Sequence, residues 1–170
     1  MKRQTIVTAL IGAGMIATTG GLASFGAAQA QVSGQGGPVM VGGDTIHMDE
    51  LAHTQTLTGR VEVIQDDARL RADKVVITRQ AGANGSGFGE VVNIVATGNV
   101  YYVTPDSTMK GDQAVYTKAT DDMVLTGDVI LTQNQNVTTG KRLVYNLTQK
   151  TTNLDAGTGR VKAIIYPDKK

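Results

Sequence analysis

The sequence contains no cysteine and no tryptophan, and it has two phenylalanines among 170 residues. Without cysteine, no disulfide bond can stabilise the fold, so the chain depends on an apolar core, which a domain of this length can form. The apolar residues are mainly Val, Leu, Ile and Ala, beside abundant Thr and Gly. Because β-branched residues favour strands and glycines favour turns, the composition predicts an all-β domain.

A basic excess is also absent, since the formal net charge is +1. The opening "MKRQ" and the short apolar run "TIVTALIGAGMIA" are typical of a signal peptide, and Ala28 and Ala30 form a small-x-small cleavage pattern. The run is shorter than the roughly 20 residues that span a bilayer, which favours cleavage after Ala30 over a retained anchor. Cleavage would remove two basic residues and no acidic one, and the resulting near-neutral surface argues against nucleic-acid binding.

Residues for catalysis or metal binding are scarce. The two histidines, His47 and His53, are too few for a tetrahedral zinc site. The carboxylate pairs Asp66–Asp67 and Asp121–Asp122 fall in predicted turns, where Asp is favoured by hydrogen bonding to the backbone. No phosphate-binding glycine motif precedes a helical pattern. We therefore predict that the protein is not an enzyme and uses no metal or cofactor.

One short motif occurs four times, as "TLTGRVEVIQ", "VATGNVYYVT", "VLTGDVILTQ" and "AGTGRVKAII". After each of the first three Thr-Gly glycines, a small residue follows at the same spacing and an apolar residue five positions later. These three sets are Gly59, Ala72 and Ile77; Gly98, Gly111 and Tyr116; and Gly127, Gly140 and Tyr145. The fourth copy, at Gly159, is truncated by the end of the chain. The constant spacing predicts repeated structural units.

Each unit reads as a β-hairpin. Apolar and polar residues alternate with a period of two, as in Leu57 to Val63, and polar stretches such as "QDDAR" and "QNQN" supply turns. We expect the hairpins to follow one another as a meander. A glycine inside a strand indicates a bulge or bend, so the recurring Thr-Gly should curve the sheet; the alternative is that each glycine only ends a turn. The segment 79–90 has the composition of a flexible loop.

One face of the predicted strands is apolar throughout. This face either fills an ordinary sandwich core or, because its side chains are of middle size, leaves a groove between two sheets. The alternation alone does not separate these two interpretations.

The words "LTGRVEV", "RADKVVITR", "KGDQAVYTK" and "LTGDVILTQ" together resemble the LptA/OstA-like family of lipopolysaccharide-transport proteins, from about Asp44 to Pro167. The resemblance implies an antiparallel β-jellyroll, in which two sheets meet in an open V around an apolar groove. It also implies a periplasmic protein that binds lipopolysaccharide through its lipid A portion and bridges the inner and outer membranes. The implied partners are an LptC-like inner-membrane protein, an LptD-like outer-membrane protein and further copies of the chain, joined head to tail through edge strands.

The resemblance also implies inward-facing positions that contact lipid, at Ile46, Tyr102 and Tyr116, with Tyr101 as an alternative to Tyr102. Combined with the apolar face, it predicts a lipid-binding groove lined by Ile46, Met48, Val61, Val63, Ile77, Val100, Tyr102, Met109, Tyr116, Leu125, Val129, Leu131 and Tyr145.

The expected organisation is a cleavable signal peptide at 1–30, a flexible segment at 31–43, one jellyroll domain at 44–167 and a short tail at 168–170. Two other functions stay open. One is an LptC-like component of the same pathway that retains residues 1–30 as a membrane anchor. The other is an exported structural β-repeat protein that has no lipid ligand.

Overall fold

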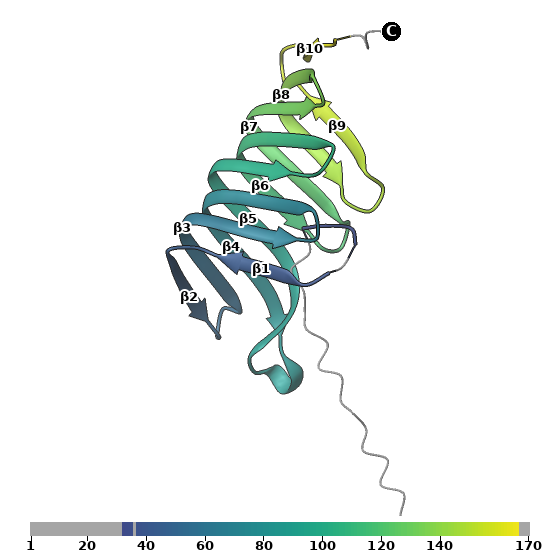
Figure 1. Ribbon diagram of the computed structural model, residues 1–170. Coiled ribbons are helices and arrows are strands. Elements are labelled where there is room, and N and C mark those ends of the chain that lie inside the picture. The colour runs from purple at the N-terminus through teal and green to yellow at the C-terminus, as the bar shows by residue number, and fades with distance from the viewer. Residues whose placement is uncertain (1–31, 36, 167–170) are drawn as a thin grey trace, which may run out of the picture.

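The computed structural model describes residues 32–35 and 37–166, so the predicted signal peptide and C-terminal tail lie outside the described residues. The described part is one antiparallel sheet of ten strands (Figure 1). From the N-terminus the strands are β1 Val39–Gly42, β2 Thr45–Asp49, β3 Thr54–Gln65, β4 Ala68–Ala81, β5 Phe88–Val103, β6 Ser107–Thr117, β7 Asp122–Gln133, β8 Asn136–Asn146, β9 Thr151–Asp155 and β10 Lys162–Ile164.

Strands β3 to β8 follow one another as a meander, as predicted, and each pairs with its neighbours in sequence. The polar stretches form the turns: Asp66, at the β3–β4 turn, and Asn134, at the β7–β8 turn, both have positive φ. A pass is one crossing of the chain through both halves of the sheet. Each of the long strands β3 to β8 makes one pass, but the first and last passes are each divided into two short strands. Strands β1 and β2 pair with the two halves of β3, while β10 and β9 pair with the two halves of β8.

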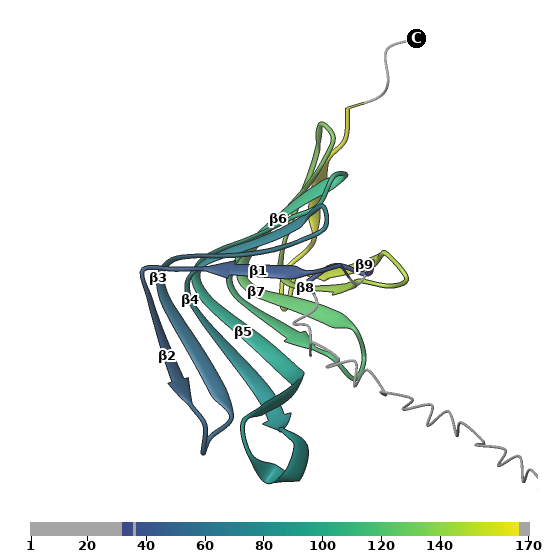
Figure 2. The ribbon, with the colours of Figure 1, turned by 60° about the horizontal axis from the view of Figure 1, so that its bottom comes forward.

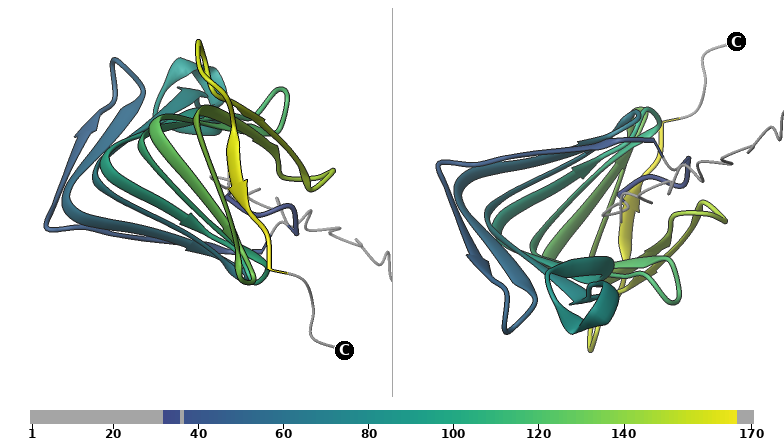
Figure 3. Two further views of the ribbon diagram at one scale, coloured as in Figure 1. Left: turned by 90° about the horizontal axis from the view of Figure 1, so that it is seen from above. Right: turned by 90° about the horizontal axis from the view of Figure 1, so that it is seen from below.

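The sheet bends sharply along one line, and each long strand passes through the bend (Figures 2 and 3). The pairing register shifts at Thr58/Val61, Thr97/Val100 and Thr126/Val129, which are the three complete Thr-Gly words. The predicted bend is thus confirmed at these positions. The two sheets of the expected V are therefore the two halves of a single folded sheet.

We call these halves arm A and arm B. Arm A holds the tight turns and comprises residues 39–42, 61–71, 100–111, 129–140 and 162–164. Arm B comprises residues 45–58, 74–97, 113–126 and 142–155. The constant spacing found in the sequence has a structural cause. The small residues Ala72, Gly111 and Gly140 each lie thirteen positions after a Thr-Gly glycine, and they pair with Val61, Val100 and Val129.

Glycine is required at the bend for two reasons. Gly127 has a φ of 105°, in the region that L side chains rarely adopt, and a Cβ there would lie 2.1 Å from Asp112 Oδ2. Gly59 and Gly98 repeat this arrangement against Asp44 and Asp73, with Cβ positions 2.3 and 2.4 Å from the facing carboxylate oxygen. The carboxylates then bond the residue after each glycine.

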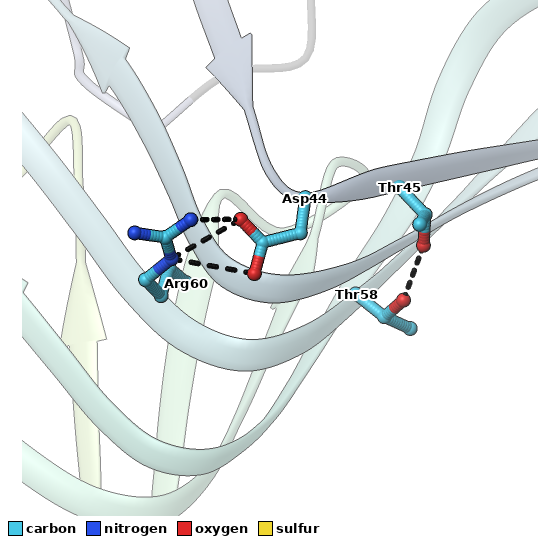
Figure 4. Close-up of polar contacts among 4 residues, drawn as sticks. All are labelled: Asp44, Thr45, Thr58 and Arg60. Atoms are coloured by element: carbon cyan, nitrogen blue, oxygen red, sulfur yellow. Dashed lines mark hydrogen bonds and ion pairs between the residues drawn. The ribbon is translucent and has the colours of Figure 1, made fainter.

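Figure 4 shows this contact at the first bend, where the Arg60 guanidinium donates to both oxygens of Asp44 at 2.6 to 3.3 Å. Beside it, the hydroxyls of Thr45 and Thr58 lie 2.6 Å apart in a hydrogen bond. At the second bend Asn99 donates to Asp73 at 2.9 Å, and at the third the Asp128 amide donates to Asp112 at 3.3 Å. An aspartate thus supports each of the three bends.

The fourth Thr-Gly word behaves differently from the first three. Gly157, and not Gly159, has a positive φ, and residues 156–161 separate β9 from β10. The expectation that Gly159 repeats the bend was therefore wrong. Asp73 and Asp112 directly follow the small residues Ala72 and Gly111. At the equivalent position after Gly140 the chain has Lys141, which donates a hydrogen bond to Asp128.

Two predicted loop segments are more ordered than expected. Within 79–90, β4 continues to Ala81 and β5 starts at Phe88, which leaves a short connection with a single 3-10 turn, η1 Ala83–Gly85. Within 31–43, the predicted flexible segment contains β1, and Val32 is fully buried. The domain therefore begins before the predicted residue 44, because β1 completes the pairing of β3.

Candidate functional site

The inner faces of the two arms carry the predicted groove residues. All of these residues except Ile46 and Met48 are buried, from Val61 on β3 to Tyr145 on β8. They belong to one continuous apolar cluster that receives side chains from both arms. The sequence periodicity therefore identified the inner face. In this structure, protein side chains fill most of the space between the arms.

Ile46 and Met48 lie on the same inner face but at its end. They pair with Leu57 and Gln55 of β3, and directly paired residues of antiparallel strands point to the same side of a sheet. Leu57 is buried, which identifies that side as the inner one. Ile46 and Met48 are 54% and 53% exposed because no strand lies beyond β2. The apolar inner surface thus continues to an open end of the sheet.

Three tyrosines from both arms approach one another inside the V. The rings of Tyr102, from arm A, and Tyr145, from arm B, lie 5.9 Å apart between centroids and tilt by 49°. The Tyr116 hydroxyl donates to Asp121 Oδ1 at 2.9 Å. Burial raises the pKa of both Tyr102 and Tyr116, so these hydroxyls stay protonated and act as neutral donors.

The alternative between Tyr101 and Tyr102 is resolved by the fold. Tyr102 is buried and faces inward, whereas Tyr101 is 36% exposed on the outer face with Lys110 Nζ 5.6 Å from its ring centroid. Tyr102 pairs with Leu70 and Met109, both of which are buried in the same cluster.

The open mouth of the V carries polar groups that the sequence did not reveal. Gln65, on β3 in arm A, is fully buried, and its carbonyl oxygen accepts from the amides of Val32 and Ser33 at 2.5 and 3.0 Å. The Tyr102 hydroxyl donates to Val32 O at 2.7 Å. Only the position of Gln65 on the apolar parity, next to the β3–β4 turn, could have indicated such a role.

A cavity of about 140 Å³ remains at this mouth, between residues 33–35 and the tips of the arms. Its lining includes Tyr102, Tyr145, Leu147 and Thr148. This volume is below the roughly 300–1,000 Å³ of common ligand pockets, so a large ligand needs the mouth to open.

A larger hollow, of about 500 Å³, lies on the outer side of the bend and is lined by Arg60, Glu62, Arg71, Tyr101 and neighbours. Its charged groups already have partners, since Glu62 accepts from Arg71 at 2.8 Å and lies 3.3 Å from Arg69. Because charged side chains that already have partners line this hollow, the inner face is the better candidate site.

Among the described residues, no group of three or more His, Cys, Asp and Glu side chains is placed to hold a metal ion. His47 lies on β2 and His53 in the turn before β3. Asp66 and Asp67 form the β3–β4 turn, as expected, whereas Asp121 is in a turn and Asp122 begins β7.

Both ends of the sheet expose apolar side chains. The β1–β2 end exposes Met40, Val41, Ile46, Met48 and Leu51, and the β10 end exposes Val161, Ile164, Ile165 and Tyr166. Edge strands also present unpaired backbone donors and acceptors, which other strands can use. Within residues 32–35 and 37–166, no helix is long and apolar enough to span a membrane.

Comparison with known proteins agrees with this geometry. Residues 40–151 match the family model described as LptA/(LptD N-terminal domain) LPS transport protein. The lipopolysaccharide export system protein LptA of Escherichia coli (strain K12) is 29% identical over 135 residues, which cover 76% of this chain and 71% of that protein. An uncharacterized protein of Rhizobium meliloti (strain 1021) is 26% identical over 136 residues, which cover 78% of this chain and 73% of that protein.

The fold also matches a solved structure. The crystal structure of LptH, described as the LptA-homologous periplasmic component of the lipopolysaccharide transport device of Pseudomonas aeruginosa, aligns with a TM-score of 0.66 at 21% identity. The alignment covers 79% of this chain and 99% of that chain. The predicted jellyroll fold is thereby confirmed.

Proposed function

The chain belongs to the LptA and LptD N-terminal domain family of lipopolysaccharide transport proteins, and on that premise we propose that it shields the acyl chains of lipid A while lipopolysaccharide crosses the periplasm. The observation that supports this proposal is the apolar inner face, which is shared by both arms and continues to the exposed Ile46 and Met48.

Exposing the acyl chains of lipid A to water has a large free-energy cost. Each acyl methylene that moves from water into an apolar environment gains about 0.8 kcal/mol, and lipid A carries several acyl chains. A groove between two apolar arms lowers the cost of crossing an aqueous compartment, while the sugar portion stays in solvent. No chemical step is required of the protein, so its residues act by burial and by hydrogen bonding.

We also propose that copies join head to tail, and that the same ends meet an LptC-like partner in the inner membrane and an LptD-like partner in the outer membrane. The exposed apolar residues and the open edge strands at both ends support this assembly. Pairing of edge strands provides backbone hydrogen bonds with little demand on side chains. Stacked copies would make their inner faces continuous.

Site-specific crosslinking in cells tests the lipid-binding proposal. A photo-crosslinking residue at Ile46 or Tyr116, on the inner face, should capture lipopolysaccharide. The matched controls are His47 and Thr117, the next residues on the same strands, whose side chains point to the outer face. Equal labelling of inner and outer positions would contradict the groove.

Sequencing the N-terminus of the exported protein separates this function from an anchored component, because a start at Gln31 excludes the anchor.

A further inference from the structure

Residues Val32–Gln35, which we call the strap, lie in the mouth of the V. Figure 3 shows this first described segment, in dark purple, between the open ends of the two arms. The strap precedes β1 and is not part of the sheet. Val32 is fully buried, and Ser33 is buried beside it. The strap therefore occupies space at the entrance to the apolar interior.

On the arm A side, the strap is held by its backbone. Gln65 Oε1 accepts from the amides of Val32 and Ser33, and Gln65 Nε2 donates to Gly37 O at 2.9 Å. The Tyr102 hydroxyl donates to Val32 O at 2.7 Å. The Ser33 hydroxyl bonds Asp66 in the β3–β4 turn. Gln65 and Tyr102 thus present an acceptor and two donors that are matched to amide groups.

On the arm B side, the strap packs against backbone. A Cβ on Gly34 would lie 2.8 Å from the carbonyl oxygen of Leu147, so the two backbones are in direct contact. The strap therefore connects the tips of the two arms close to the contact between Tyr102 and Tyr145.

Gln65 places a polar side chain within the apolar inner face at the mouth of the V. Gln65 is fully buried on an inner face that is otherwise largely apolar, and a buried amide without partners is costly. The strap supplies partners for its oxygen, and Gly37 supplies one for its nitrogen. Any ligand that replaces the strap must also satisfy Gln65 and Tyr102. Lipid A meets this demand, because it carries amide-linked acyl chains in which an N–H and a C=O lie next to long apolar tails.

We propose that Gln65 and Tyr102 form an amide-recognition site at the groove mouth, which the strap occupies in the free protein and which an amide-linked acyl chain of lipid A takes over by displacing the strap. The inference rests on the proposed lipid-binding function. It assigns to the strap the role of an internal competitor, so that the affinity for lipid falls by the fraction of molecules in which the strap is bound.

A reversible lock tests the proposal. In the Ser33→Cys/Asp66→Cys variant of the signal-peptide-free chain, a disulfide would hold the strap in place, and no other cysteine interferes. The control, Thr45→Cys/Thr58→Cys, places a disulfide at the bend, where the two side chains are also in contact. Binding of purified rough lipopolysaccharide is measured for both variants, oxidised and reduced.

We expect oxidation to weaken lipopolysaccharide binding by about tenfold or more in the strap variant and to leave the control unchanged. Equal affinity of the oxidised and reduced strap variant would overturn the strap proposal and leave the lipid-binding function standing. No binding by the unmodified protein would overturn the proposed function, and this inference with it.

A second measurement needs no disulfide. In the unmodified chain, hydrogen exchange at the Val32 and Ser33 amides should become faster when lipopolysaccharide binds, because both amides lose Gln65 as their acceptor. Unchanged exchange in a protein that binds the lipid would contradict displacement of the strap.

A Gln65→Leu variant should lose more affinity for lipopolysaccharide than for a diacyl phospholipid that has only ester linkages. Equal losses of affinity for the two lipids would contradict amide recognition.

Discussion

The central passes of the sheet, β3 to β8, and its two end passes are built from the same repeat but differ in continuity and in cover. Each central strand runs unbroken through the bend, and its inner face is covered by neighbouring strands and by the other arm. Each end pass is divided into two short strands, and several of its apolar residues are exposed, such as Ile46 at 54% and Ile164 at 60%. The apolar side chains of the central strands are therefore buried within the chain, whereas those at the two ends remain available to pack against a partner.

The largest expected contrast is in stability. Leu125→Ala, in the fully buried centre of β7, should lower the free energy of unfolding by about 2–5 kcal/mol, because it removes buried methyl groups and leaves a cavity. Ile46→Ala, on the same face at the exposed end, should cost less than about 1 kcal/mol. Urea unfolding followed by circular dichroism measures both. Similar losses would show that the end is packed as tightly as the centre.

The bends offer a second contrast. Gly127→Ala in the central bend should cost about 2–4 kcal/mol, because a Cβ meets Asp112 at 2.1 Å in a backbone region unfavourable to alanine. Gly157→Ala at the end has a similar backbone strain, but its nearest neighbour is Lys141 Cβ at 3.8 Å, so about 1 kcal/mol is expected. The same urea titrations compare the two variants. Equal losses in the free energy of unfolding would show that the facing aspartate does not contribute to the requirement for glycine.

Sequence reasoning succeeded where the repeat is regular. The constant spacing predicted repeated hairpins, and Ile77, Tyr116 and Tyr145 all face inward as their shared parity indicated. It failed at Gly159, because residues 156–161 interrupt the strand there and the constant spacing no longer applies.

The part of the site that involves the strap could not be predicted, because Val32 and Gln65 are 33 residues apart and share no pattern. The aspartates at the bends had a weak signal that spacing could have revealed: Asp73 and Asp112 each directly follow the small residue of their repeat. Their role depends on a positive φ at the facing glycine, which sequence alone does not show.

A third test concerns self-association. Met48→Pro, on the edge strand β2, removes a backbone donor and should reduce concentration-dependent oligomers strongly, while the free energy of unfolding falls less than in Leu125→Ala. Met48→Thr removes the apolar side chain but keeps the donor, so it separates the two contributions. Light scattering over a range of concentrations measures the effect. Oligomers of unchanged size in the proline variant would contradict strand pairing at this end.

The smallest effect is expected at the first bend. The hydrogen bond from Arg60 lowers the pKa of the Asp44 carboxyl. A lowered pKa in the folded state stabilises the protein above the unfolded pKa of about 3.9, and this contribution is lost as the pH falls through the lower folded value. Because both side chains are exposed, Asp44→Asn should be barely less stable than the parent at pH 7 and equal to it near pH 2. A large loss at pH 7 would show that the ion pair is essential to the bend.

The meander has a further consequence for length. Apart from the divided ends, each strand's neighbours in space are its neighbours in sequence, so the molecule grows along one dimension. Inserting one complete hairpin between Thr117 and Asp122 would lengthen the stack by about 9.6 Å, at roughly 4.8 Å per strand, without rebuilding either end. The reach of a single chain is therefore set by how many times its repeat is copied, and this can change by gene duplication in whole hairpins.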